Sequence, residues 1–149
     1  MSDSYLLDAN ILLRRIDETS DKQVVVIAAL ERLAIQGARL CIVAQTLFEF
    51  WAVATRPIQN NGIGLTPSQA AQEVANIRAA FELLPEAPLI DEWQRLVTTY
   101  GVSGKPTHDA RYVAAMKVHQ LDKVLTFNGS DFARFASGEN ISIVDPAKV

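Results

Sequence analysis

Cysteine and histidine are scarce in this sequence, and their scarcity excludes two kinds of architecture. The 149 residues include one cysteine, Cys41, and two histidines. A single cysteine cannot build an intramolecular disulfide framework or a cysteine-rich zinc site. With two histidines, a zinc site would need mostly carboxylate ligands, whereas zinc prefers sulfur and nitrogen. The sequence therefore predicts a core that is stable without disulfides or structural zinc.

Long apolar runs and an excess of positive charge are also missing. The longest apolar run, residues 24–30, has seven residues, whereas a membrane-spanning helix needs about 20. Acids stand before and within the first apolar run, unlike the pattern of a secretory signal. With 17 acids against 14 bases the net charge is −3, which excludes a polybasic arm as the main binding device. We expect a cytoplasmic protein without membrane attachment.

What remains is the pattern of a globular α/β protein, and its length fits one domain over residues 1–149. Short apolar segments predict five strands, at residues 5–7, 40–43, 81–84, 123–126 and 141–144. Between them the sequence predicts helices over 10–16, 21–36, 46–55, 66–80, 90–100 and 106–119, with a short helix or turn over 128–135. The strands are apolar on both faces, which is typical of a parallel sheet between two layers of helices.

Four acids fall where the predicted strands end. Asp8 closes the first strand, Glu49 lies one turn into the helix after the second, and Asp131 follows the fourth. Asp109 lies in the first turn of the helix that precedes the fourth strand. Since this helix leads into a parallel strand, it begins at the same carboxyl edge, where α/β sheets bind ligands. The sequence therefore predicts that the four carboxylates gather at one edge.

Each acid also has a local explanation. Thr46 and Glu49 match a capping box, Asp109 suits the positive end of a helix dipole, and Asn128 with Asp131 matches a helix cap. The acid that ends the first strand is equally a turn former. Four carboxylates at one edge would nevertheless repel one another strongly without a partner. A hard cation such as Mg²⁺ or Mn²⁺ is that partner, because it takes carboxylate oxygens and water.

A carboxylate-held metal points to phosphoryl chemistry, since metal ions activate water and stabilise charge on phosphate oxygens. The cation would also let an acidic protein act on a polyanion. Candidate phosphate contacts near the edge, each equally explained as a solvated surface charge, are Arg14, Arg15, Arg56, Lys105 and Arg111. Trp51 and Trp93 lie at helical positions suited to core or dimer packing, with base stacking as the alternative.

Four stretches of the chain, residues 6–10, 46–50, 108–115 and 125–132, together carry a family resemblance. In this order and separation they resemble the PIN-domain family of metal-dependent nucleases, and within it the VapC-type toxin ribonucleases. The resemblance implies a parallel sheet with strand order 3-2-1-4-5 and endonucleolytic cleavage of RNA with Mg²⁺ or Mn²⁺. It also implies a homodimer and, for a toxin, a small antitoxin protein as partner.

The resemblance assigns roles to seven residues. The acids that would hold the metal and carry catalysis are Asp8, Glu49, Asp109 and Asp131. The polar residues that would orient them are Asn10, Thr126 and Asn128. Two alternatives stay open: a catalytically silent PIN-fold module for RNA binding or dimerisation, and an RNA-processing nuclease outside toxin systems. The presence of both Asp8 and Asp109 favours the enzyme.

Overall fold

A computed structural model describes residues 3–149 and contains one five-stranded sheet. Its strands are β1 (Ser4–Leu7), β2 (Arg39–Ile42), β3 (Glu82–Leu83), β4 (Lys123–Leu125) and β5 (Ser142–Val144). All four pairings are parallel and the order is β3-β2-β1-β4-β5. The predicted fold class and strand order are therefore confirmed.

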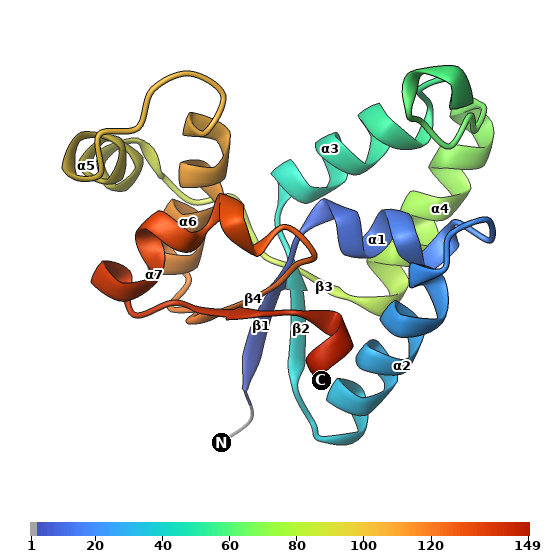
Figure 1. Cartoon of the computed structure of the whole chain (residues 1–149), viewed down its shortest axis with the longest axis horizontal. Coiled ribbons are helices and arrows are strands. Elements are labelled where there is room, and N and C mark those ends of the chain that lie inside the picture. The colour runs from blue at the N-terminus through green and yellow to red at the C-terminus, as the bar shows by residue number, and fades with distance from the viewer. Residues whose placement is uncertain (1–2) are drawn as a thin grey trace.

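Helices cover both faces of the sheet (Figure 1). The α-helices are α1 (Ala9–Ile16), α2 (Lys22–Ile35), α3 (Ala44–Ala54), α4 (Pro67–Ala80), α5 (Ile90–Thr99), α6 (Thr107–Val118) and α7 (Ala133–Glu139). Short 3-10 helices are η1 (Ile58–Asn60), η2 (Gly129–Asp131) and η3 (Pro146–Lys148). On one side α5, α6 and α7 pack on the sheet, and on the other side α1 to α4 do so.

Alternation along β1 shows how the sequence divides the core between the two layers. Leu6 belongs to the cluster beneath α5, α6 and α7, whereas Tyr5 and Leu7 belong to the cluster beneath α1 to α4. Successive residues of a strand point to opposite faces, so a strand buried on both faces must be apolar throughout. The apolar strands that predicted a central sheet therefore have their physical reason in this double core.

Two predicted boundaries are wrong. The helix expected to begin at Thr46 begins at Ala44, because Val43 has an extended backbone and forms the N-cap. The Val43 N–H donates to the Thr46 hydroxyl at 3.2 Å, so that hydroxyl caps the helix from within its first turn. The strand predicted over 81–84 covers only Glu82–Leu83, a short edge strand with both residues exposed.

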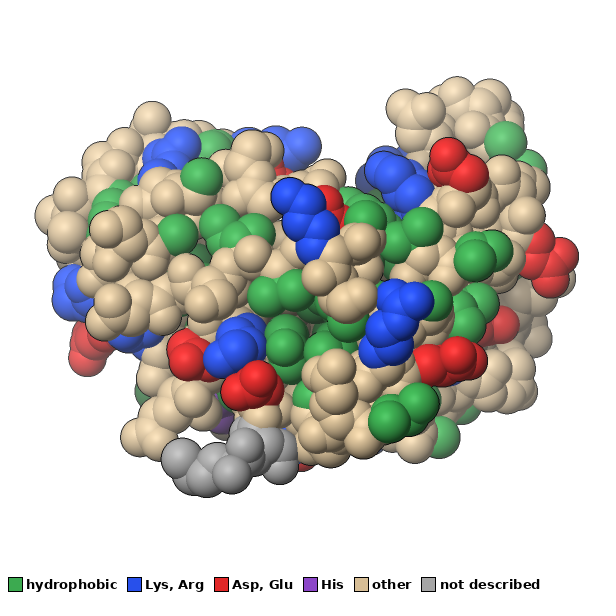
Figure 2. Space-filling view, turned by 60° about the horizontal axis from the view of Figure 1, so that its bottom comes forward, with side chains coloured by type: hydrophobic (Ala, Val, Ile, Leu, Met, Phe, Trp, Pro, Cys, Tyr) green, Lys and Arg blue, Asp and Glu red, His purple; other side chains and the backbone are tan. Residues whose placement is uncertain are grey.

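The face toward which the amino ends of β1 and β2 point carries mixed charge. Figure 2 shows basic and acidic side chains interspersed around a central band of hydrophobic ones. Mixed signs at close spacing make little net field. Within residues 3–149, none of the helices combines the length and apolar character needed to cross a membrane.

Candidate metal and nucleic-acid site

Asp8 stands at the carboxyl end of β1 and is held by hydrogen bonds on both carboxylate oxygens. It is the N-cap of α1, and its Oδ1 accepts from the Ala9 N–H at 2.7 Å. Its Oδ2 accepts from the Thr126 hydroxyl at 2.8 Å and from Asn10 Nδ2 at 3.1 Å. The side chain is only 8% exposed. These contacts fix the carboxylate where β1 and β4 end side by side.

A polar chain behind Asp8 joins α1 to the segment after β4. Asn10 Nδ2 also donates to the Thr126 hydroxyl at 3.1 Å, and Asn10 Oδ1 accepts from the Phe127 N–H at 3.2 Å. Asn128 takes part through its backbone, whose N–H donates to the Thr126 hydroxyl at 2.9 Å. Its side chain is exposed at the start of η2 and makes no cap there. The orientation of Asp8 thus depends on two segments more than 100 residues apart.

Glu49 projects from α3, and both of its carboxylate oxygens accept hydrogen bonds from side chains. Gln45 Nε2 donates to Oε1 at 2.9 Å, and the Tyr112 hydroxyl donates to Oε2 at 2.6 Å. The capping-box explanation for Glu49 is therefore wrong, because the helix begins earlier and its cap uses Thr46. Glu49 therefore does not cap its own helix, and the Tyr112 hydroxyl of α6 holds its carboxylate.

Gln45 links the helix that carries Glu49 to the helix that carries Asp109. Its Nε2 also donates to the backbone carbonyl of His108 at 2.9 Å. Asp109 follows directly, half-buried in the first turn of α6. The amide of Gln45 therefore ties α3 to the N-terminus of α6 where the two acids lie.

Burial and neighbouring negative charge perturb the acid on β1. The pKa of Asp8 is raised to about 6, mainly by burial, with smaller contributions from the charges of Glu49 and Asp131. Hydrogen bonds from Thr126 and from the Ala9 N–H act in the opposite direction, because they favour the ionised form. Desolvation therefore outweighs the hydrogen bonds at this carboxylate.

Asp109 responds to the same group of charges. Its pKa is raised to about 6, first by burial and then by the charges of Asp131, Asp8 and Glu49. His108 has a smaller, opposite effect. Asp8 and Asp109 thus both lie within the field of Glu49 and Asp131. The exposed Asp131 takes part from η2.

The donor set fits a hard, hydrated cation. Within residues 3–149, no three acidic, histidine or cysteine side chains stand close enough to bind one ion directly. Mg²⁺ keeps several of its waters and is commonly held by one or two carboxylates. Because the acids repel one another and offer only oxygen, their chemistry suits a cation that some of them contact through water. They do not suit zinc.

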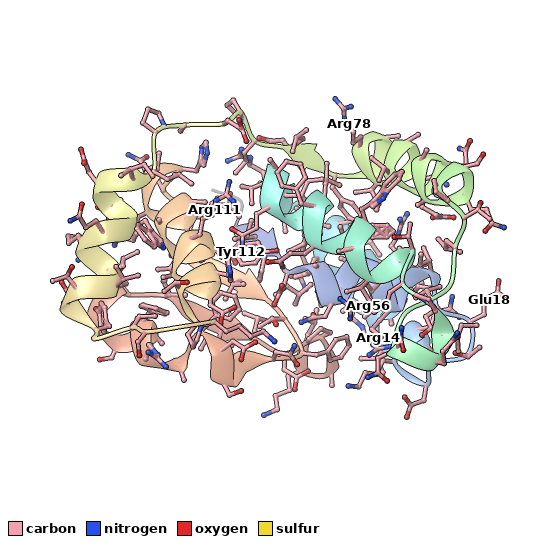
Figure 3. The ribbon with its side chains drawn as sticks, turned by 90° about the horizontal axis from the view of Figure 1, so that it is seen from above. Arg14, Glu18, Arg56, Arg78, Arg111 and Tyr112 are labelled. Atoms are coloured by element: carbon pink, nitrogen blue, oxygen red, sulfur yellow. The ribbon has the colours of Figure 1, made fainter. Side chains whose placement is uncertain are left out.

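The candidate phosphate-binding bases have different surroundings, seen from above the carboxyl edge in Figure 3. Arg111 and Tyr112 lie where α6 faces α3, and Arg14 and Arg56 lie on the α1 and α3 side. Arg14 pairs with Asp17 at 3.3 Å. Arg15 instead lies over the Phe81 ring, 5.2 Å from its centroid. Arg56, Lys105 and Arg111 are exposed.

Gln45 and Tyr112 were not among the residues singled out from the sequence. Spacing signals were present: Gln45 stands four residues before Glu49, and Tyr112 three residues after Asp109. Such pairs share one helix face. The contact from Tyr112 to Glu49 joins residues 63 apart, so only the folded arrangement of α6 opposite α3 reveals it.

The PIN domain family model matches residues 5–138, and the chain belongs to this family. A comparison with curated proteins gave no match. Among solved structures, VapBC2 from Rickettsia felis bound to a promoter DNA fragment matches with a TM-score of 0.68 and 17% identity, covering 95% of this chain and 98% of that one.

Two further structures resemble the chain. VapBC-1 from nontypeable Haemophilus influenzae has a TM-score of 0.67 and 16% identity, covering 97% of this chain and 99% of its own. VapC20 from Mycobacterium tuberculosis, described as a toxin that cleaves the sarcin-ricin loop, has a TM-score of 0.64 and 16% identity, covering 88% and 95%. At these identities the likeness establishes the shared fold.

Proposed function

We propose that this protein is a metal-dependent endoribonuclease that acts as the VapC-type toxin of a toxin–antitoxin pair. One observation carries the proposal. Asp8 and Asp109 have their pKa raised to about 6 by burial and by the other acids at the same sheet edge. Carboxylates buried at one sheet edge, within the field of other acids, indicate a cation-binding function.

In this proposal, Asp8, Glu49, Asp109 and Asp131 hold Mg²⁺ or Mn²⁺. When bound, the cation supplies charge neutralisation at the phosphate and activation of water for hydrolysis of the phosphodiester. Thr126 and Asn10 keep the Asp8 carboxylate in one orientation. Such outer contacts matter because metal affinity depends on how its ligands are held.

Glu49 is oriented separately, through Gln45 and Tyr112. The exposed cations Arg56, Lys105 and Arg111 are assigned to substrate phosphates, since the acids themselves would repel RNA. Arg14 and Arg15 have competing contacts with Asp17 and Phe81. We therefore expect smaller effects from replacing these two.

The toxin assignment extends the likeness to VapBC structures. It implies a small antitoxin partner, a homodimer and a cytoplasmic setting, with residues 1–149 acting as one domain. Phe48 and Trp51 expose apolar surface one turn apart on α3, which suits burial in a subunit contact. The RNA-processing alternative differs in predicting a nuclease without a neutralising protein partner.

Cleavage of structured RNAs with Mn²⁺ tests the proposal, with Asp109→Asn as the site variant. Asp91→Asn is the matched control, because Asp91 is an exposed acid in the first turn of α5. We expect chelator to abolish cleavage, Asp109→Asn to lower it by about 100-fold or more, and the control to behave as wild type. Equal residual cleavage in both variants would indicate contamination. Absence of both cleavage and Mn²⁺ binding by calorimetry would favour the silent module.

A further inference from the structure

A cavity of about 580 Å³ lies beside the acids, between the start of α3, the segment at residues 84–89, α5 and α6. Its volume is within the range of small-molecule sites, about 300–1,000 Å³. Residues on its walls include Gln45, Leu84, Trp93, His108, Arg111 and His119. The cavity is thus mainly apolar and aromatic, with a few polar groups.

The cavity and the acidic site share a wall. Gln45 and His108 line the cavity, and the Gln45 amide contacts both Glu49 Oε1 and the His108 carbonyl, each at 2.9 Å. Asp109 is the residue after His108. A phosphate held at the acids would therefore place the adjoining nucleotide at the mouth of this cavity.

The walls suit a flat heteroaromatic ring. The Trp93 indole N–H already donates to the Thr107 carbonyl at 3.0 Å, so this side chain offers the cavity its ring rather than a donor. Every base has a π-face, so stacking on an aromatic ring is open to any RNA base. Arg111 supplies positive charge beside it, and Glu86 is the one carboxylate among the residues that line the cavity.

One polar atom at this wall lacks a partner. Gln45 is 6% exposed, and within residues 3–149 its Oε1 is the buried side-chain oxygen without a hydrogen bond. Both Nε2 contacts are in use, so the amide orientation is determined. A buried acceptor without a donor costs free energy.

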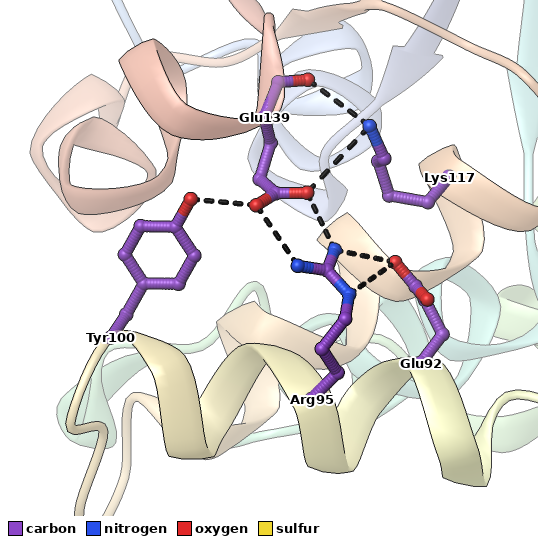
Figure 4. A network of polar contacts seen from close by, with 5 residues as sticks. All are labelled: Glu92, Arg95, Tyr100, Lys117 and Glu139. Atoms are coloured by element: carbon purple, nitrogen blue, oxygen red, sulfur yellow. Dashed lines mark hydrogen bonds and ion pairs between the residues drawn. The ribbon is translucent and has the colours of Figure 1, made fainter.

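Ion pairs tie α5, which forms the outer wall of the cavity, to the neighbouring helices. Arg95 of α5 pairs with Glu139 at the end of α7 and with Glu92, each at 2.6 Å. Glu139 also accepts from the Tyr100 hydroxyl at 2.6 Å and pairs with Lys117 of α6 at 3.6 Å (Figure 4). The segment at residues 84–89 contains two prolines, which limit its freedom. These contacts hold α5, which carries Trp93, against α6 and α7.

We propose that this cavity binds one unpaired nucleobase of the RNA, next to the scissile phosphate. Trp93 contributes the apolar wall, and Gln45 and His108 join this wall to the acids. The inference rests on the proposed ribonuclease function for the identity of the polymer. The acidic centre would contact only the phosphate, which is the same in every nucleotide. The base-binding subsite would add a source of sequence preference.

Binding without cleavage tests the subsite. Asp109→Asn protein in chelator is titrated with a short single-stranded RNA of mixed sequence, and with the same RNA carrying one abasic residue at each position in turn. We expect one abasic position to weaken binding about 10-fold. Ala87→Phe, which fills the cavity from the 84–89 segment, should weaken binding of the intact RNA by a similar factor. The variant should then bind the intact RNA and the decisive abasic RNA with equal affinity.

The matched control is Ala71→Phe, an equal enlargement on the exposed face of α4 outside the cavity. It should bind as the parent does. A second readout uses Trp93 fluorescence in a Trp51→Phe background, where intact RNA should quench emission and the decisive abasic RNA should not. This readout needs no enlarged side chain, so it holds if Ala87→Phe folds poorly.

The outcomes separate the two proposals. Unchanged RNA affinity in Ala87→Phe, with equal binding of every abasic RNA, overturns the subsite even if the wild type cleaves RNA. The subsite would also be overturned if Ala87→Phe lost a partner protein but kept its RNA affinity, since the cavity would then hold a peptide side chain. Cavity-dependent base binding by a wild type that never cleaves would support the subsite and refute the nuclease.

Discussion

Ionisation of Asp8 opposes folding, and Asp8→Asn isolates this effect. The pKa of Asp8 rises from 3.8 to about 6 on folding, and a pKa difference of one corresponds to about 1.36 kcal/mol. Between these two values the folded protein keeps a proton that the unfolded chain has released, so stability falls as pH rises. Above pH 6 the free energy of unfolding is lower by about 3 kcal/mol because Asp8 is ionised. Below pH 3.8 Asp8 is protonated in both states and this destabilisation is absent.

Urea unfolding of wild type and Asp8→Asn, without divalent metal, measures this term. Between about pH 4 and about pH 7.5 the difference in unfolding free energy should change by about 2.4 kcal/mol in favour of the variant, because the unfolded Asp8 is already partly ionised at pH 4. Comparing two pH values removes the pH-independent loss of the Thr126 contact at 2.8 Å. In the variant Asp109 also ionises more easily, which adds in the same direction.

Asp91→Asn controls for the loss of one negative charge, since Asp91 is exposed on α5. Its difference from wild type should change little with pH. The reasoning is refuted if Asp8→Asn differs from wild type by the same amount at both pH values. It is also refuted if the variant loses stability, relative to wild type, as pH rises.

Three further predictions concern pH, Glu49 and the clamp on α5. Cleavage should rise as pH passes through about 6, because Asp8 and Asp109 must release protons before they bind a cation; a pH–rate profile tests this. Tyr112→Phe should lower the Mn²⁺ affinity by about 10-fold or more, because Glu49 Oε2 loses its hydrogen bond from the Tyr112 hydroxyl. Calorimetry measures this affinity. An unchanged affinity would show that Tyr112 contributes only to packing. Glu139→Gln should lower the unfolding free energy by about 1–3 kcal/mol in urea titrations while the Mn²⁺ affinity stays at the wild-type level.

The sheet could be predicted from sequence because its determinants are local. Strands buried on both faces must be short and apolar, and helices connect them in a parallel arrangement. The predicted start of α3 was wrong because a side chain in its first turn caps a residue earlier in the chain. Thr46 signals a helix start, yet its hydroxyl caps the N–H of Val43 three residues earlier.

The acids were predictable as a set because parallel topology brings the ends of distant strands to one edge. Their supports were predictable only in part. Asn10 and Thr126 contact Asp8 from positions flanking the strand ends. Gln45 and Tyr112 depend on how closely α3 and α6 approach, and no residue pattern specifies that distance.

The shared role of Gln45 makes a physical link between the acids and the cavity. One amide nitrogen bonds both Glu49 and the carbonyl before Asp109, while its oxygen is left without a partner. Gln45 also lines the cavity, so a base bound there would rest against the residue that ties α3 to α6. The acids repel one another, so the protein needs such ties to keep them within reach of one cation. Recognition of a base and orientation of the metal ligands would then be properties of the same side chain, and a substrate lacking that base would lose both.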